Sequence, residues 1–378
     1  MSKEKIEIKE KNESQEVKPK HQKGKRITII LIVVIALVII AGGVGAYFGF
    51  VYNKLPGSNK SNTPEFGKTE SQGQAETPYY GVLSGTKTTK ENSERRPVVV
   101  MLGNDPVARP LAGLSKADMV VEMPVLINDI TRLMAVYQTQ YPTEIGGIRS
   151  ARHNFIELAN GLDALMVHWG GSFRAESYFK LNYIDHVDGL TDGSAFYRVS
   201  RKAAPYNGYS NFDKIQTRAQ EKGYRITTTF NAYTFEDEPK EADRGTKGTL
   251  EIPYPGNDEV SFKYDPATND YVRYNNGELQ KDEIDGAELH AKNIVVMRTT
   301  YGSLLGSQYL DVKVMGSGDC TVYQNGKSQA CTWKKDSSDR HNPLQFYDSA
   351  NKQIPFVRGT TWIEIVKPSY DVKWTPAS

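Results

Sequence analysis

The sequence predicts an exported membrane protein with an α+β or α/β N-terminal domain, a mainly antiparallel all-β C-terminal domain and one N-terminal transmembrane helix. Three observations lead to this fold class. Residues 27–52 form one uncharged, mostly aliphatic run. Residues 79–243 mix β-branched runs with segments of helical period, which is typical of mixed domains. Residues 244–375 contain short strand-like runs separated by Gly, Asn, Asp and Pro turns, which is typical of sandwiches and barrels.

The apolar run at residues 27–52 is long enough to span a bilayer. At about 1.5 Å per residue, a helix of this length exceeds the roughly 30 Å hydrocarbon core. Residues 1–26 carry nine Lys/Arg against five Glu, so the positive-inside bias keeps this tail in the cytoplasm and places the C-terminal domains outside the cell. The alternative is a cleaved signal peptide, whose apolar region usually has about 7–15 residues. We therefore expect a single-pass protein of the cell membrane.

Two features next to the span concern its partners. Gly45 and Gly49 have the G-x-x-x-G spacing that lets two membrane helices pack closely, so a homodimer is an alternative to the ordinary glycine content of single spans. Residues 53–78 are rich in Ser, Thr, Gly and Pro and predict a flexible linker with a mean reach of about 28 Å. Beyond the membrane, 38 Lys/Arg stand against 40 Asp/Glu, a balance that argues against nucleic-acid binding.

The N-terminal domain is predicted to combine strands with helices. Its β-branched and alternating runs predict strands at residues 97–102, 118–125, 131–140 and 164–169. Apolar positions at helical spacing predict three helices, one capped by Ser150, one over residues 173–181 and one over residues 212–223. Strands and helices in this order give an α/β or α+β domain.

The C-terminal domain contains the two cysteines of the chain. Its strands are predicted at residues 260–265, 271–279, 293–300, 309–316, 320–333, 344–348 and 360–366. Cys320 and Cys331 flank Asn325-Gly326 symmetrically, so a two-residue hairpin turn there places them opposite each other, within reach of a disulfide. An exported location permits this bond, with two free thiols as the alternative. Zinc would need four ligands, and no second pair of cysteines is present.

The order and spacing of several motifs resemble the YerB-like family of bacterial proteins, which are described as lipoproteins. The motifs are RPVVVMLGN, ARPLAGLSKADMVVE, ITRLMAVYQ, GGIRSARHNFIELA, VHWGGS, SRKAAPYNGY, YDPATNDYVRYNNGE, GKSQACTW and GTTWIEIV. The resemblance covers nearly all of residues 79–368 and implies a bacterial envelope protein, without an established reaction. This chain departs from the family in having a spanning segment in place of a lipidated Cys, and Tyr206 where the family more often has His.

The first candidate site is an arginine-rich stretch at the start of a predicted helix. Arg149, Ser150 and Arg152 lie there, where free backbone N–H groups and the helix dipole favour an anion. Guanidinium groups suit carboxylate or phosphate oxygens because they donate two parallel hydrogen bonds. Further arginines expected to join this anion site are Arg132, Arg198 and Arg201. The alternative is that the arginines pair internally with Glu122, Asp118 or Asp129.

The second candidate site is the turn from His168 to Ser172. A strand that feeds Gly170-Gly171 and then a helix resembles a nucleophile elbow, which makes Ser172 a candidate nucleophile and His168 a candidate base. Arg174 stands where that motif needs its second glycine. The alternatives are a helix N-cap for Ser172, a core position for His168, and a close approach of ligand or backbone at the two glycines.

Other polar side chains give weaker indications of chemistry. Glu122 and Asp129 are candidates for glycan hydrolysis, but the sequence does not give the separation of the two carboxylates. Asp185, His186 and Asp188 lack the spacing of known metal sites. The sequence therefore predicts no metal and no cofactor.

These features favour the binding of an anionic cell-wall or envelope ligand in an Arg-lined cleft of the N-terminal domain. The ligand would be a peptide carboxylate, a phosphate-bearing polymer or an acidic sugar. Two alternatives remain open, an enzyme that modifies wall glycan or peptide through Glu122, His168 and Ser172, and a scaffold for envelope complexes. Arginines in an open pocket would favour binding or catalysis, and arginines buried in ion pairs would favour the scaffold.

Overall fold

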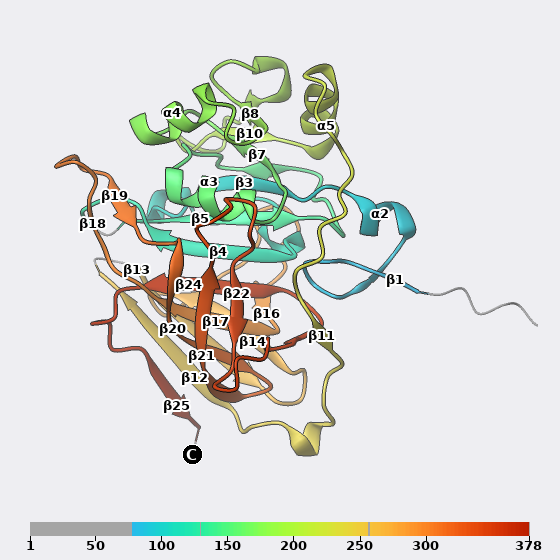
Figure 1. Ribbon diagram of the computed structural model, residues 1–378, viewed down its shortest axis with the longest axis vertical. Coiled ribbons are helices and arrows are strands. Elements are labelled where there is room, and N and C mark those ends of the chain that lie inside the picture. The colour runs from blue at the N-terminus through green and yellow to red at the C-terminus, as the bar shows by residue number, and fades with distance from the viewer. Residues whose placement is uncertain (1–77, 129, 256–257, 378) are drawn as a thin grey trace, which may run out of the picture. The chain divides into compact units, whose positions relative to one another are not determined.

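A ten-stranded sheet organises the protein, of which the computed structural model describes residues 78–128, 130–255 and 258–377 (Figure 1). The hydrogen-bonded order of its strands is β22 (Gln345–Tyr347), β21 (Lys327–Lys335), β20 (Gly316–Gln324), β17 (Asn293–Arg298), β24 (Thr361–Val366), β4 (Met119–Pro124), β5 (Thr131–Tyr137), β3 (Val98–Gly103), β7 (Leu165–His168) and β8 (His186–Asp188). Strand β24, from the end of the chain, lies between β17 and β4 and pairs in parallel with both. The sheet therefore combines strands from both predicted domains.

The inner strands of this sheet are buried along their whole length. Every residue of β3, β4, β5 and β24 is buried. Continuous buried runs are expected of strands that are covered on both faces, whereas strands with one wet face alternate. Val99 and Met101 of β3 belong to one hydrophobic core, and Val98 and Val100 belong to the other.

Helices and a second sheet cover the two faces of the large sheet. Helices α3 (His153–Asn160) and α4 (Phe173–Lys180) pack into the first core. Helix α5 (Phe212–Glu221) and the second sheet pack into the other core. The strand order of the second sheet is β15 (Glu278–Leu279), β14 (Asp270–Asn275), β13 (Asp258–Asp265), β12 (Gly248–Tyr254) and β25 (Lys373–Pro376), and β16 (His290–Ala291) also pairs with β14. Figure 1 shows α4 and α5 at one end of the molecule and the second sheet at the other.

Short elements complete the described part of the chain. They are β1 (Tyr79–Tyr80), β2 (Lys87–Thr88), α2 (Lys90–Glu94), β6 (Ile145–Gly146), β9 (Tyr197–Arg198), β10 (Gly208–Ser210), β11 (Phe235–Glu236), β18 (Tyr301–Ser303), β19 (Leu310–Val312) and β23 (Phe356–Val357). Four 3₁₀ turns are η1 (Pro106–Ala108), η2 (Leu114–Lys116), η3 (Gly193–Ala195) and η4 (Glu241–Asp243). Strands β6, β10 and β9 form a small sheet. In the chain, β6 precedes helices α3 and α4, and β9 and β10 follow them.

The described protein is mostly β with few helices, and several of its strands, such as β12 and β25, are not predicted from the sequence. Strands β3, β4, β5 and β7 and helices α3, α4 and α5 confirm the predicted order in residues 79–243. The predicted cap is wrong, because α3 begins at His153 with Arg152 as its N-cap, and Ser150 lies two residues earlier. Residues 244–375 form strands where they are described, but five of these strands extend the sheet of the preceding segment.

The predicted disulfide between Cys320 and Cys331 is confirmed. The two residues lie opposite each other in the β20–β21 hairpin, with Cα atoms 4.8 Å apart and an S–S bond of 2.04 Å. Asn325 and Gly326 form the turn with φ angles of 56° and 68°. A two-residue hairpin of this type needs positive φ at both central positions, which Asn and Gly adopt readily.

Several predictions concern residues 1–77, which lie outside the described residues. These are the tail at 1–26, the span at 27–52 with Gly45 and Gly49, and nearly all of the linker at 53–78. Across residues 78–377, as far as they are described, no helix has the length and apolar character needed to cross a bilayer. Asp129 also lies outside the described residues.

Candidate functional site

Three arginines meet where strand β3 ends. Arg132 of β5 lies opposite Gly103, the last residue of β3. Arg149 and Arg152 lie in the connection from β6 to α3, and the backbone N–H of Arg149 donates to the carbonyl of Met101 in β3 over 2.8 Å. The charges of Arg149 and Arg152 both act on Arg132. We call these three residues the arginine cluster.

The backbone around the arginine cluster is held in place by neighbouring turns. The N–H of Ala151 donates to the carbonyl of Gly170 over 2.8 Å, and the N–H of Ser172 donates to the carbonyl of Ala151 over 3.1 Å. Gly103 makes room for the stem of Arg149, because a Cβ at this glycine would lie 2.8 Å from Arg149 Cγ. Gly103 therefore allows the arginine-bearing segment to pack closely against β3.

Within the described residues, the arginine cluster has no ion-pair partner within 4.0 Å. Arg132 Nη1 donates to the carbonyl of Ser150 over 2.6 Å, Arg152 Nη1 to the carbonyl of Ala151 over 2.9 Å, and Arg149 Nη1 to that of Pro205 over 3.3 Å. The Nε atoms of all three arginines are enclosed without a partner. The internal partners proposed from the sequence are engaged elsewhere where they are described, since Glu122 pairs with Arg273 and Asp118 accepts from Ser84 and Thr139.

Burial makes the charges of the arginine cluster unfavourable. Arg132 is 3% exposed and Arg152 is 6% exposed. Burial, followed by the charges of Arg152 and Arg149, lowers the pKa of Arg132 well below its ordinary value, while the carboxylate of Asp105 has a smaller opposite effect. Burial also lowers the pKa of Arg152 to about 10. The cluster is therefore electropositive and only weakly compensated by the protein.

Two tyrosine rings lie against the guanidinium groups of the cluster. Arg149 lies over Tyr206 at 4.8 Å from the ring centroid, and Arg152 lies over Tyr309 at 4.7 Å. Such contacts orient a planar guanidinium group without supplying a negative charge. Tyr206, noted in the sequence for its place before Asn207, packs on an arginine of the cluster.

The two other predicted arginines do not join the arginine cluster. Arg201 is paired with Glu144 and with Glu283, whose carboxylate lies 2.7 Å from Arg201 Nε. Arg198 is exposed, lies over the ring of Trp169 at 4.5 Å and donates to Asn207 Oδ1 over 2.6 Å. The prediction that both residues line the anion site is therefore wrong for the described geometry.

His168 is a buried core residue. It is 0% exposed, and its ring stacks on Phe179 with centroids 4.3 Å apart. Its Nδ1 donates to the carbonyl of Gly170 and its Nε2 accepts from Nδ1 of His186, both over 2.9 Å. Burial lowers the pKa of His168 to about 4, so the ring is neutral at physiological pH. The core interpretation therefore holds, and His168 does not face the arginine cluster as a ligand.

Ser172 and Glu122 are also enclosed by the protein. Ser172 is 0% exposed and caps α4, where its Oγ accepts from the N–H of Ala175 over 3.4 Å. Glu122 is 0% exposed and accepts from Asn104 and Thr131. The described geometry gives no support to the catalytic roles considered for Glu122, His168 and Ser172, because all three side chains are 0% exposed. In the part of the chain that the structure describes, no group of three His, Cys, Asp or Glu side chains is arranged to hold a metal ion.

A buried ion network surrounds Arg273, on the second sheet. Arg273 is 2% exposed and lies 2.5 Å from a carboxylate oxygen of Glu122 and 2.9 Å from one of Glu364. Burial, followed by the charge of Glu122, raises the pKa of Glu364 to about 8. The hydroxyl of Tyr254 donates to Glu364 over 3.1 Å. The network joins β4, β14 and β24, so it ties the second sheet to the large one.

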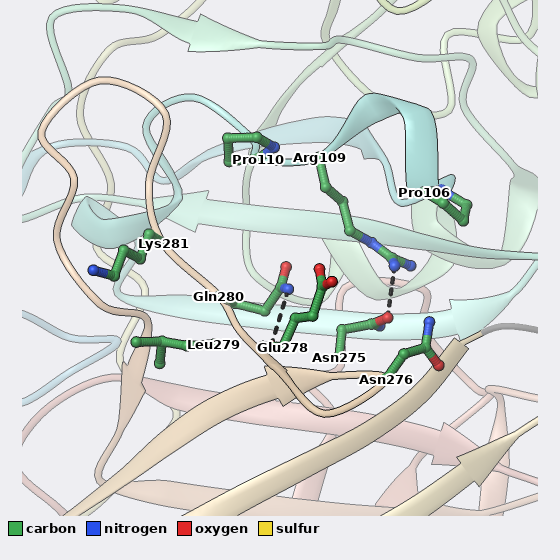
Figure 2. A pocket seen from close by; sticks show the side chains of 9 residues that line it. All are labelled: Pro106, Arg109, Pro110, Asn275, Asn276, Glu278, Leu279, Gln280 and Lys281. Atoms are coloured by element: carbon green, nitrogen blue, oxygen red, sulfur yellow. Dashed lines mark hydrogen bonds between the residues drawn. The ribbon is translucent and has the colours of Figure 1, made fainter.

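A cavity of about 400 Å³ lies beside this network, between turn η1 and the β14–β15 hairpin (Figure 2). We call it the Arg109–Asn275 pocket. Its lining consists of Pro106, Arg109, Pro110, Asn275, Asn276, Glu278, Leu279, Gln280 and Lys281. Figure 2 shows Arg109 reaching from the turn toward the hairpin, where its Nη1 donates to Asn275 Oδ1 over 2.6 Å. Sequence analysis missed this pocket, because it predicted one strand over residues 271–279 where the structure has a turn between β14 and β15.

Comparisons with known proteins agree with this two-part architecture. Residues 83–225 match the profile of "Protein of unknown function (DUF3048) N-terminal domain", and residues 250–363 match that of the DUF3048 C-terminal domain. YerB of Bacillus subtilis (strain 168), named as a candidate lipoprotein, is 33% identical over 294 residues, which cover 75% of this chain and 85% of YerB. A crystal structure of YerB from Bacillus subtilis superposes with a TM-score of 0.71 at 31% identity and covers 78% of this chain and 99% of that chain.

Proposed function

The chain belongs to the DUF3048 family of YerB-like proteins, and from this premise we propose that it is an extracytoplasmic envelope protein that binds an anionic ligand through Arg132, Arg149 and Arg152. The observation that carries the proposal is a set of three arginines, two buried and one half-buried, without an ion-pair partner among the described residues. A buried charge normally has a compensating partner, because its desolvation is unfavourable. A bound anion would supply that partner.

The chemistry of the cluster suits a phosphate or carboxylate group. Each guanidinium group has Nη atoms besides the one that donates to a backbone carbonyl, and these match the two oxygens of a carboxylate or phosphate. Arg152 is the N-cap of α3, so the free N–H groups of the first helical turn lie next to the cluster. A phosphate-bearing or carboxylate-bearing component of the cell wall or envelope is the ligand class that we propose.

The envelope location is supported by the sequence and by the relative. The uncharged run at residues 27–52 and the basic residues before it favour a cytoplasmic N-terminus and an extracellular C-terminal part. The description of YerB as a candidate lipoprotein supports a membrane-attached protein. Protease added to intact cells should degrade residues 78–378 and spare residues 1–26. Protection of the whole chain would contradict this location.

Calorimetry with inorganic phosphate and with acetate tests the proposed anion site. Residues 75–378 form one compact unit and serve as the soluble protein. Arg149→Ala and Arg152→Ala should each weaken binding of the preferred anion by about tenfold or more, since a charge-assisted hydrogen bond contributes about 1.5–3 kcal/mol. Arg198→Ala is the matched control, because Arg198 is exposed and outside the cluster. The affinity of Arg198→Ala for the anion should equal that of the parent protein.

Thermal melts of the same proteins test whether the cluster has a purely structural role. Phosphate or acetate should raise the melting temperature of the parent and not that of the two variants. A large loss of melting temperature in both variants, without any anion-dependent stabilisation of the parent, would show that the arginines brace the fold and bind nothing.

A further inference from the structure

The Arg109–Asn275 pocket differs in its chemistry from the arginine cluster. Its walls combine the amides of Asn275, Asn276 and Gln280 with the carboxylate of Glu278 and the cations Arg109 and Lys281. Pro106, Pro110 and Leu279 supply its apolar part. Its volume of about 400 Å³ lies within the range of about 300–1,000 Å³ found for small-molecule sites. Donors and acceptors are mixed here, so the lining does not select simply for an anion.

Asn275 carries an unpartnered donor at this pocket. The side chain is 2% exposed, and its Oδ1 accepts from Arg109 Nη1 over 2.6 Å. A guanidinium group only donates hydrogen bonds, so the atom of Asn275 that faces it must be the oxygen. This contact fixes the orientation of the amide and leaves Nδ2 as a buried donor without a partner. A buried donor of this kind is unfavourable by about 1–3 kcal/mol until an acceptor reaches it.

The surroundings of Asn275 keep this donor in position. Arg109 Nε donates to Asn104 Oδ1 over 3.1 Å, and Asn104 in turn donates to Glu122 of the buried ion network. Arg273, the centre of that network, lies two residues before Asn275 on β14. The base of the pocket is therefore rigid. Its rim consists of the hairpin residues Glu278 and Lys281, which are exposed.

We propose that the Arg109–Asn275 pocket is a second ligand site, separate from the arginine cluster, and that it takes an N-acylated sugar unit. The carbonyl oxygen of the acyl group accepts from Asn275 Nδ2. The ring hydroxyls, which donate and accept, exchange hydrogen bonds with the amide of Gln280 and the carboxylate of Glu278. Amides match hydroxyl groups because each amide also presents one donor and one acceptor group. The apolar edge of the ring packs against Leu279 and Pro110.

Titration of residues 75–378 with N-acetylglucosamine, followed by NMR, tests this site. N-acetylglucosamine should bind, and glucose, which lacks the acyl carbonyl, should bind about tenfold more weakly. Asn275→Asp keeps an oxygen facing Arg109 but replaces the Nδ2 donor with an acceptor. It should therefore weaken the binding of N-acetylglucosamine by about tenfold or more. Leu279→Trp should block the pocket without altering the polar contacts of Asn275. Ile284→Trp is its control, because Ile284 is exposed and lies outside the lining.

The outcomes separate this proposal from the anion site. Loss of N-acetylglucosamine binding in Asn275→Asp and Leu279→Trp, with phosphate binding retained, would support a second site. Equal binding of both sugars, or binding that neither variant changes, would overturn it. Absence of any sugar binding to the parent would also overturn it and would leave the arginine cluster untouched.

Discussion

Arg273 and Arg132 are buried to nearly the same extent, at 2% and 3% exposed, but their electrostatic surroundings are opposite. Arg273 lies between Glu122 and Glu364 and over the ring of Trp362 at 4.3 Å. Arg132 donates to a backbone carbonyl and lies near two further arginines. The compensated arginine joins three strands of two sheets. Arg132 has no carboxylate within 4.0 Å among the described residues, which is the reason for our proposal that a ligand compensates its charge.

His168 shows a third way to bury a basic side chain. It is 0% exposed, and burial keeps its ring neutral although Asp188 Oδ1 lies 3.7 Å from its Nδ1. Arginine cannot follow this route at physiological pH because its pKa is too high. The anion that we propose would supply the counter-charge that the buried arginines of the cluster lack, whereas the neutral histidine requires none.

The largest effect is expected for Arg273→Met. This change leaves Glu122 buried without its counter-charge and Glu364 without its hydrogen bond from Arg273, so it should reduce the free energy of unfolding by about 3–5 kcal/mol. Urea denaturation of residues 75–378 measures the loss. The triple variant Arg273→Met, Glu122→Gln and Glu364→Gln should recover most of it. No recovery would mean that Arg273 acts through packing on Phe262 and Trp362 and not through its charge.

The pH dependence of the free energy of unfolding should show the protonation of His168 on unfolding. Its folded pKa of about 4 lies below the roughly 6.5 of an unfolded chain, so the unfolded state binds more protons between these values. The lowered pKa of His168 therefore makes a contribution to the free energy of unfolding that is fully present above pH 6.5. About 3 kcal/mol of stability is lost as the pH falls toward 4. His168→Asn retains a donor for the carbonyl of Gly170 but does not titrate. Urea denaturation from pH 7 to 4 should therefore show a shallower slope for this variant, and parallel slopes would contradict the assignment.

Arg132→Met should have a small effect on stability and a large one on binding. Replacing an uncompensated buried charge with an apolar side chain of similar length should change the free energy of unfolding by no more than about 1 kcal/mol in anion-free buffer. The stabilisation of the parent by phosphate or acetate should disappear. A loss as large as that of Arg273→Met would show that Arg132 has the same structural role.

Arg149→Lys should produce the smallest change. Lysine keeps the positive charge but cannot donate in the paired geometry of a guanidinium group, so anion affinity should fall less than in Arg149→Ala. Calorimetry should therefore rank the parent first, Arg149→Lys second and Arg149→Ala last. Equal affinities of lysine and arginine at this position would mean that only net charge matters to the ligand.

Local features of the molecule could be predicted from sequence, and long-range contacts could not. Asn325-Gly326 and the flanking cysteines predict their hairpin because all the determinants lie within 12 residues. The partners of Arg201 are 57 and 82 residues away, and Asn275 is 166 residues from Arg109. Periodicity gives no information at such separations. It predicts where Arg149 and Arg152 lie, but not that their neighbours Arg198 and Arg201 turn to other partners.

The position of β24 in the large sheet has a consequence for the order in which the protein is made. β24 occupies residues 361–366, close to the C-terminus, and its partner β4 occupies residues 119–124. At about 5–20 residues per second, the ribosome needs on the order of 10–50 s to produce the intervening chain. β4 lacks β24 as a neighbour during that whole time, and β17 lacks it from its own synthesis at residues 293–298 onward. Open strand edges recruit other chains. A polypeptide that ends before residue 361 therefore has two open strand edges, which only β24, near the C-terminus, can cover.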